Sequence, residues 1–309
     1  MGMIRTLTRL GLRRPPPPLC PIGLDQLERN WQYRPSRPDA VDRLRRLRAL
    51  GRWQPAPAHE CLVPIRGARD RWIVYFLFLP AGRSLDSAHR YTLARLRASG
   101  TGLLVVCAAA RAADVPAELH GIADALYWKA LGGFDFSAYA LGLHAIAAAN
   151  PGADVLVLND SVFGPFGPID ALWPLMTWDL TGFTACGQVE NHIQSYAFHL
   201  KNVTPQRMAG LAQVLPAGRA HDQYEPVVLR QETRLAVDAA RRMSVGALWY
   251  GAPDLTVDPS LFAAMPLVEA GFPFLKRALR TKHTGIYPDE AIRAVLVRRG
   301  HPPGDGPPP

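Results

Sequence analysis

The residues best suited to chemistry follow an apolar run near the middle of the chain. Asn159, Asp160 and Ser161 come directly after Ala153 to Leu158, a run that predicts a buried strand, and Asp135 lies in a Gly-Phe-Asp turn just before a predicted helix. Ligands of open α/β sheets bind beyond the carboxyl ends of the strands. A carboxylate at that position is suited to a hydroxyl-rich ligand or to a divalent metal that carries phosphates.

The bend after this strand contains two Gly-Pro steps, in the run VFGPFGP from Val162. These breakers turn the chain away from the sheet, so Gly164 is predicted to lie beside the ligand. The alternative is that Asn-Asp-Ser forms only a turn with a helix cap. Both interpretations stay open, and the functional one is favoured.

Two further groups of polar residues lie downstream. His192, Gln194 and Ser195 open another predicted strand, and their imidazole, amide and hydroxyl groups suit sugar hydroxyls or an ordinary structural network. Glu232 begins a predicted helix over 232–242. It is either a catalytic base or a first-turn residue that the helix dipole stabilises.

Several common enzyme classes lose their main support, because the chain contains no GxxxxGK[ST], GxGxxG, GxSxG or HExxH motif. The four cysteines show no CxxC spacing, which favours free thiols in a reducing compartment. No apolar run reaches the roughly 20 residues of a membrane span, and no signal peptide is recognisable, so a cytoplasmic protein is expected.

The positive charge is concentrated near the N-terminus. The net charge is +9, and residues 1–56 contain twelve arginines, no lysine and four acidic residues, which account for eight of those charges. This distribution predicts an enzyme with a basic arm, and nucleic acid is not expected as a partner. Residues 1–14 form a basic amphipathic stretch that either lies on an anionic membrane, as in a peripheral protein of the inner membrane face, or is a solvated start.

The pattern of elements predicts an α/β fold. Apolar strands are expected over 71–79, 101–109, 153–158, 180–187 and 195–203, with helices over 84–99, 136–149 and 169–177 between them. Continuous apolar strands that alternate with helices indicate a mostly parallel sheet covered by helices on both faces. The predicted organisation is a Pro-broken arm over 1–56, one domain over 57–300 and a disordered Pro/Gly tail over 301–309.

Five blocks of the chain resemble the rhamnan synthesis protein F family. They are GGFDFSAYALGL from Gly132, LVLNDSVFGPFGPI from Leu156, DLTGFT from Asp179, HIQSY from His192 and GFPFLKRALR from Gly271. They occur in the family's order over roughly residues 70–280. The family is regarded as glycosyltransferases of surface polysaccharide assembly, often linked to rhamnose.

A more distant likeness, to nucleotide-sugar glycosyltransferases with a GT-A (Rossmann-like) fold, implies roles for individual residues. Asp160 would belong to the metal and sugar-diphosphate site, with Mg²⁺ or Mn²⁺, and Glu232 would be the base. Lys276 would offset the charge of the leaving diphosphate. Asp135, Asn159, Ser161, Gly164, His192, Gln194 and Ser195 would complete the substrate site.

The chain departs from both patterns. Asn159-Asp160-Ser161 offers one carboxylate where a GT-A motif has two, and Trp128-Lys129 replaces the Arg-x-Asn of the family. The expected function is transfer of a sugar, such as L-rhamnose from dTDP-rhamnose, to a lipid-linked or polysaccharide acceptor with inversion. The alternative is a carbohydrate-binding or assembly subunit that keeps the fold without catalysis.

Overall fold

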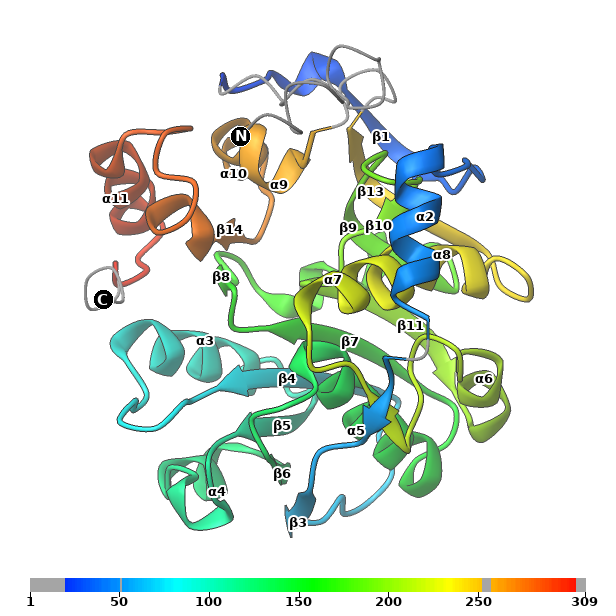
Figure 1. Ribbon diagram of the computed structural model, residues 1–309. Helices are drawn as coiled ribbons and strands as arrows, with labels where there is room; N and C mark the ends of the chain where they lie inside the picture. The colour runs from blue at the N-terminus through cyan, green and yellow to red at the C-terminus, as the bar shows by residue number, and fades with distance from the viewer. Residues whose placement is uncertain (1–19, 51, 252–256, 304–309) are drawn as a thin grey trace.

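The computed structural model describes residues 20–50, 52–251 and 257–303. Its centre is a ten-stranded sheet in the order β1-β13-β9-β11-β7-β4-β5-β6-β3, with β10 paired to β9 (Figure 1). The strands of this sheet are β1 (Leu27–Gln32), β3 (His59–Val63), β4 (Arg71–Phe78), β5 (Gly102–Ala108), β6 (Ala125–Lys129), β7 (Ala153–Asn159), β9 (Leu180–Cys186), β10 (His192–Ile193), β11 (Ala197–Val203) and β13 (Val245–Gly251). Two short ladders pair β2 (Gln54–Pro55) with β12 (Arg219–Ala220) and β8 (Val162–Phe163) with β14 (Leu275–Lys276).

Helices connect the strands and cover the sheet. The α-helices are α2 (Ala40–Arg48), α3 (Ser87–Arg97), α4 (Glu118–Ile122), α5 (Phe134–Ala149), α6 (Pro205–Gly210), α7 (Tyr224–Val227), α8 (Thr233–Ala239), α9 (Pro259–Phe262), α10 (Ala264–Glu269) and α11 (Asp289–Arg298). The π-helical segment η5 (Val228–Glu232) joins α7 to α8. Short 3-10 turns are η1 (Leu24–Gln26), η2 (Ala112–Asp114), η3 (Ile169–Ala171), η4 (Trp173–Leu175) and η6 (Arg277–Arg280).

The predicted α/β fold is confirmed. β7, β4, β5 and β6 form a parallel block, and β9 and β13 are also parallel to each other. Antiparallel pairing is found where β11 joins β7 to β9, and at the two edges, where β1 and β3 close the sheet. The apolar, buried side chains over 72–77 of β4 fit a strand that is covered on both faces.

Side chains of β4 alternate between two hydrophobic cores. Ile73 and Tyr75 belong to the core that α3, α4, α10 and α11 cover, whereas Trp72 and Val74 belong to the core that α5 and α8 cover. Helices therefore lie on both faces of the sheet, as predicted (Figure 1). Gly142 lets α5 approach the sheet closely, because a Cβ there would lie 2.7 Å from Val74.

The chain order creates a switch point between β4 and β7. From β4 the chain moves outward to β5 and β6, and α5 then carries it back to β7 on the other side of β4. The connections leave the carboxyl ends of these two strands in opposite directions. A crevice at such a point is the usual ligand site of an open α/β sheet.

Part of the predicted N-terminal arm belongs to the folded domain. β1 is the edge strand of the main sheet and pairs antiparallel with β13. Trp31 is fully buried and stacks on Tyr250 with ring centroids 4.4 Å apart. The domain thus includes residues before 57, because burial of this tryptophan holds β1 on the sheet. The amphipathic stretch over 1–14 lies outside the described residues.

Three local predictions are wrong in detail. The helix expected over 169–177 consists of two 3-10 turns, since Pro174 lacks the N–H that a continuous helix needs. Glu232 does not begin a helix, because the helical chain already starts at Tyr224. The disordered tail does not begin at His301, because this side chain is buried and its ring centroid lies 4.3 Å from that of Tyr91.

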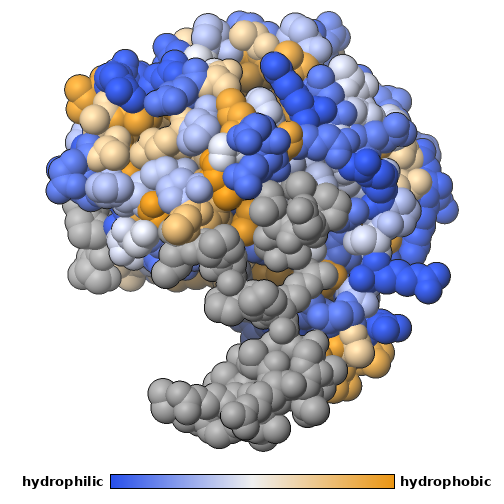
Figure 2. All heavy atoms as spheres, turned by 90° about the horizontal axis from the view of Figure 1, so that it is seen from above, coloured by the Kyte–Doolittle hydropathy of each residue, from blue (hydrophilic) through white to orange (hydrophobic). Residues whose placement is uncertain are grey.

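The surface mixes hydrophilic and apolar side chains, as the face seen from above shows (Figure 2). Within the described ranges, no helix has the length and apolar character that a membrane span needs. Cys107 and Cys186 are buried, Cys20 and Cys61 are exposed, and all four are free thiols.

Candidate functional site

A cavity of about 680 Å³ lies at the switch point. The ends of β4 and β7, the start of α5, the segment before β11, the helix over 224–232 and β14 all contribute to its walls. Its lining combines four carboxylates, two amines and several aromatic rings, from Asp135, Asp160, Asp222, Glu232, Lys276, Lys282, Phe76, Phe78, Phe134, Tyr196 and Tyr224. The volume falls in the range of small-molecule sites, and this lining suits a ligand with polar, charged and planar parts.

Asp160 lies directly after β7 and is held from β4. Its backbone N–H donates to Phe76 O at 3.0 Å, and its Oδ2 accepts from the Phe78 N–H at 2.8 Å. The side chain is 18% exposed, and burial raises the pKa of the Asp160 carboxyl. This strand-end carboxylate is therefore fixed in direction while it faces the cavity.

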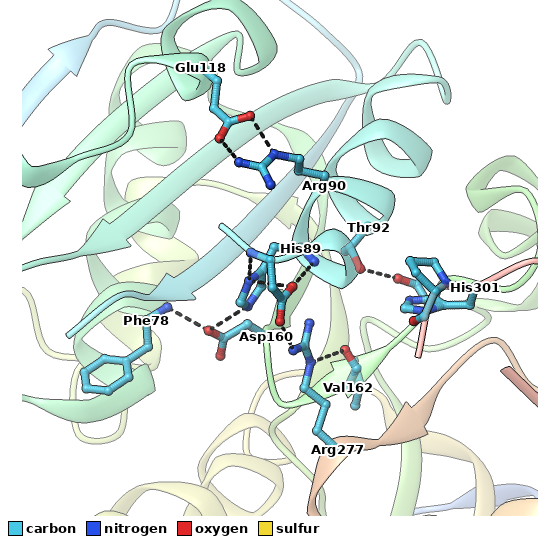
Figure 3. Close-up of polar contacts among 12 residues, drawn as sticks. Phe78, His89, Arg90, Thr92, Glu118, Asp160, Val162, Arg277 and His301 are labelled. Carbon is cyan, nitrogen blue, oxygen red and sulfur yellow. Dashed lines mark hydrogen bonds and ion pairs between the residues drawn. The ribbon is translucent and has the colours of Figure 1, made fainter. Parts of the chain in front are cut away.

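A chain of ionisable groups extends from Asp160 (Figure 3). His89 Nε2 lies 3.9 Å from Asp160 Oδ2, and His89 Nδ1 lies 2.9 Å from Asp86 Oδ1. Arg277 NH1 contacts the other oxygen of Asp86 at 3.2 Å. Burial opposes ionisation of Asp86, but its bonds from His89 and the Arg277 charge hold the pKa of that carboxyl below its usual range.

Asp135 is joined to β7 by a buried network. The structure places it in the first turn of α5 rather than before the helix, and its Oδ1 accepts from the Phe136 N–H at 2.9 Å. Its Oδ2 accepts from Asn159 Nδ2 at 3.2 Å and from the Tyr139 hydroxyl at 3.3 Å. Asn159 Oδ1 accepts from the Ser161 hydroxyl at 2.6 Å. Both ends of the Asn159 amide are thus engaged, so Asn159 orients Asp135 and Ser161.

Glu232 reaches the cavity from the π-helical segment. Its Oε1 accepts from the backbone N–H of Ser195 at 3.0 Å and from the Ser195 hydroxyl at 2.8 Å. No hydrogen bond to Oε2 is found within the described ranges, so that oxygen can accept from a ligand. Single π-helical turns are rare and occur frequently at functional sites. Ser195 and Glu232 thus form one unit, although 37 residues separate them.

Burial and a neighbouring charge affect the carboxyl group of Asp135. Burial first, and then the negative charge of Glu232, raise the pKa of Asp135 to about 6. The Asp135 carboxyl therefore binds a proton more tightly in the folded chain than in the unfolded chain. Its contribution to stability is complete below the ordinary pKa of 3.8 and is lost as the pH rises toward 6.

The raised pKa of Asp135 predicts that the stability of wild-type protein and that of Asp135→Asn depend differently on pH. Wild-type protein should lose stability from pH 4 to 6 relative to Asp135→Asn, because the amide has no proton to release. The free energy of unfolding of Asp135→Asn will be lower than that of wild type. Its NH₂ group replaces an oxygen that accepts hydrogen bonds, and it therefore faces donors from which it cannot accept. Urea unfolding at several pH values measures the slopes, with the exposed Asp170→Asn as control. Equal slopes for wild type and Asp135→Asn would contradict the raised pKa.

Lys276 supplies positive charge to the cavity. Its Nζ lies 3.9 Å from the centroid of the Tyr196 ring. Burial lowers the pKa of the Lys276 amine, while the charges of Asp258, Glu232 and Asp135 oppose that effect. Across the described part of the chain, the ammonium group forms no hydrogen bond or ion pair. It is therefore available to an anionic group of a ligand.

Three residues predicted for substrate binding lie outside the cavity lining. Gly164 O accepts from the Thr92 hydroxyl at 2.6 Å, and a Cβ on Gly164 would lie 2.3 Å from Pro273 O. His192 is buried with Nδ1 2.8 Å from Glu190 O, and Gln194 accepts from the Thr184 hydroxyl. These hydrogen bonds are to the protein itself, which corresponds to the structural alternative left open for His192 and Gln194.

Several residues of the cavity could not be found from the sequence, among them Asp222 and Lys282. Asp222 Oδ1 accepts from the Gly133 N–H at 2.6 Å and so fixes the entry to α5. Gly133 has a φ of 80°, and a Cβ there would lie 2.7 Å from Pro57. The Gly132-Gly133 pair was a usable signal for this close approach, whereas nothing local identified Asp222.

A metal at Asp160 finds little support in the surrounding donors. Among the residues that the structure describes, no three His, Cys, Asp or Glu side chains are grouped as metal ligands. One oxygen of Asp160 accepts from Phe78, and the Asn159 oxygen accepts from Ser161. This donor set does not fit a resident Mg²⁺ or Mn²⁺ ion, which prefers several oxygen ligands.

Comparisons with known proteins give a distant likeness. No family model and no curated protein matches the sequence, so membership in the rhamnan synthesis protein F family is not confirmed. One similar solved structure is a "putative nucleotide-diphospho-sugar transferase" from Desulfovibrio desulfuricans G20, with 14% identity and a TM-score of 0.35. The match covers 74% of this chain and 98% of that chain. At this TM-score the likeness carries no argument about function.

Proposed function

We propose that this protein is a glycosyltransferase that uses a nucleotide-sugar donor and a hydroxyl acceptor. The best support is that one cavity holds both the Glu232 carboxylate, which Ser195 fixes, and the Lys276 ammonium group, which has no hydrogen bond or ion pair among the described residues. Sugar transfer needs a base at the acceptor hydroxyl and a positive charge at the leaving diphosphate. Aromatic rings of the cavity suit the planar base of a nucleotide.

The proposed reaction is a single displacement. The acceptor oxygen attacks the anomeric carbon, and its proton passes to Glu232 Oε2. The bond from the anomeric carbon to the diphosphate oxygen breaks, and the leaving oxygen keeps the electron pair. Lys276 and Lys282 offset that charge, while Asp160 accepts hydrogen bonds from sugar hydroxyls. Attack from the face opposite the leaving group inverts the anomeric centre.

The finer identity of the substrates rests on the resemblance of the sequence blocks alone. We propose dTDP-rhamnose as the first donor to test and a lipid-linked or polysaccharide acceptor. A cytoplasmic protein bound peripherally to an anionic membrane through residues 1–14 accords with such an acceptor.

Binding of nucleotide sugars tests the proposal directly. Thermal unfolding is measured with dTDP-rhamnose, with UDP-sugars and with the free nucleotides. A ligand at 100 times its Kd stabilises the folded state by about 2.7 kcal/mol, so a true donor raises the melting temperature by several degrees. Slow release of nucleotide diphosphate without acceptor then shows turnover. If no nucleotide sugar shifts the melting temperature, the proposal is wrong.

A carbohydrate-binding or assembly subunit is the second candidate. The observation that favours it is the single carboxylate after β7, together with Lys129, which is buried and donates to Gly132 O at 2.6 Å. Lys129 belongs to the Trp128-Lys129 pair, which stands where the resembled family often has Arg-x-Asn. This candidate predicts stabilisation by oligosaccharides and no release of nucleotide diphosphate from any donor.

A further inference from the structure

A second, basic cleft of about 330 Å³ lies between α2 and the helical segment over 228–239. It is lined by four guanidinium groups, one carboxylate and one amide, from Arg46, Arg230, Arg234, Arg241, Asp238 and Gln213. None of these residues lines the cavity at the switch point. No sequence motif pointed to this cleft, because α2 is far from α8 in the chain.

Two carboxylates neutralise part of this positive charge. Buried Glu190 contacts Arg46 NH2 and lies 3.7 Å from Arg234 NH1. Asp238 Oδ1 lies 3.1 Å from Arg234 NH2 and 3.4 Å from Arg241 NH2. Two carboxylates thus face four guanidinium groups, and the cleft keeps an excess of positive charge.

Among the described residues, Arg230 is the arginine of this cleft that forms no ion pair with a carboxylate. Its Nε is buried and has no hydrogen-bond partner. Over the described residues, its side chain forms neither a hydrogen bond nor an ion pair. Burial, and then repulsion by Arg46 and Arg234, lower the pKa of the Arg230 guanidinium. Buried polar groups in native proteins are nearly always paired, so this one points to a ligand.

We propose that this cleft binds a phosphoryl anion, either as free phosphate or as the headgroup of an anionic lipid. The planar fork of a guanidinium group matches two oxygens of a phosphate, and several arginines around one site suit a doubly charged anion. The lipid source is included because Leu44, Leu47 and Leu50 of the α2 region are 49%, 61% and 50% exposed. The proposal is independent of the glycosyltransferase activity.

The site also shares an element with the cavity. Arg230 and Glu232 both belong to the π-helical segment, and Arg230 lines the cleft while Glu232 accepts from Ser195 in the cavity. A bound anion would therefore restrain the segment that carries Glu232.

Calorimetric titration with inorganic phosphate and pyrophosphate tests the proposal at constant ionic strength, because salt screens such sites. The test variant is Arg230→Gln/Arg241→Gln, which leaves Arg46 and Arg234 to hold Glu190. Arg83→Gln, at an exposed arginine outside both sites, is the matched control. We expect at least tenfold weaker binding in the double variant and none of this loss in the control. Equal binding by wild type and the double variant would overturn the proposal for free phosphate.

Vesicles distinguish the two sources of the anion. Sedimentation with phosphatidate-containing vesicles is compared with neutral phosphatidylcholine vesicles for the same three proteins. Loss of phosphatidate-specific binding in the double variant supports a lipid headgroup, and loss confined to the calorimetric titration supports free phosphate. If the double variant binds the free anions and the phosphatidate vesicles as wild type does, the proposal is wrong. It is also wrong if wild type binds neither the free anions nor the phosphatidate vesicles.

Melting temperatures without anion give an independent check. Single substitution Arg230→Gln should leave the melting temperature unchanged or raise it, because repulsion by Arg46 and Arg234 is relieved. A clear decrease would show that Arg230 has a structural partner and would contradict the proposed role.

Discussion

Replacing Glu232 by Gln should lower sugar transfer by roughly a thousandfold, within the range for a general base. The amide cannot take the proton of the sugar-acceptor hydroxyl, yet its oxygen can still accept hydrogen bonds from the Ser195 N–H and hydroxyl. Donor affinity should stay nearly unchanged, because the base contacts the acceptor rather than the nucleotide. Stability should change by about 1 kcal/mol or less, since the two hydrogen bonds are retained.

A matched control comes from the same helix. Glu225 is 48% exposed, lies outside the cavity and pairs with Arg45. Glu225→Gln should keep wild-type turnover, with at most a small loss of stability. Single-turnover rates, donor Kd and melting temperature are measured for both variants. Normal turnover by Glu232→Gln would exclude it as the base and direct attention to Asp135.

Asp160→Asn should lower turnover by roughly a hundredfold, which corresponds to about 3 kcal/mol of transition-state stabilisation. The reason is that a charged acceptor at the end of β7 is replaced by a neutral one that also donates. The fold should be kept, because the amide oxygen still accepts from the Phe78 N–H. The substitution also removes the negative charge that faces His89.

Asp154 provides the control for Asp160. It lies at the other end of β7 and likewise accepts from a backbone N–H, that of Asn202, at 2.9 Å. Asp154→Asn should therefore cost similar stability but leave turnover at the wild-type level. Activity assays and urea unfolding of both variants separate the two effects. If both variants turn over at the wild-type rate, Asp160 has no part in the reaction.

Much of the fold could be predicted because its signals are local. β4, β5, β7 and β9 each contain a mostly apolar run, and such a run predicts a buried strand without knowledge of its neighbours. The position of Asp160 follows from the same signal, because the residue after such a strand lies at the edge of the sheet.

The limits of domains and helices were harder to predict from the sequence. The arginine-rich segment before residue 57 is typical of a separate arm, but buried Trp31 holds β1 on the sheet. The helix expected over 169–177 had apolar residues at suitable spacing, yet Pro174 limits it to 3-10 turns. In the first case a local feature of the sequence competed with packing that exists only in the folded chain, and in the second the proline outweighed the apolar spacing.

The sequence by itself determined the α/β class, the apolar strands and the strand-end carboxylate, because each follows from the order of apolar and polar residues along a short segment. Only the tertiary structure decided which polar groups meet. Glu232 and Ser195 are 37 residues apart, and Arg277 reaches Asp86 across 191 residues. Such pairs depend on the order of the strands in the sheet and on the return of β14 to β8. The strand order and the pairing of β14 with β8 are determined by contacts between distant segments rather than by local sequence patterns.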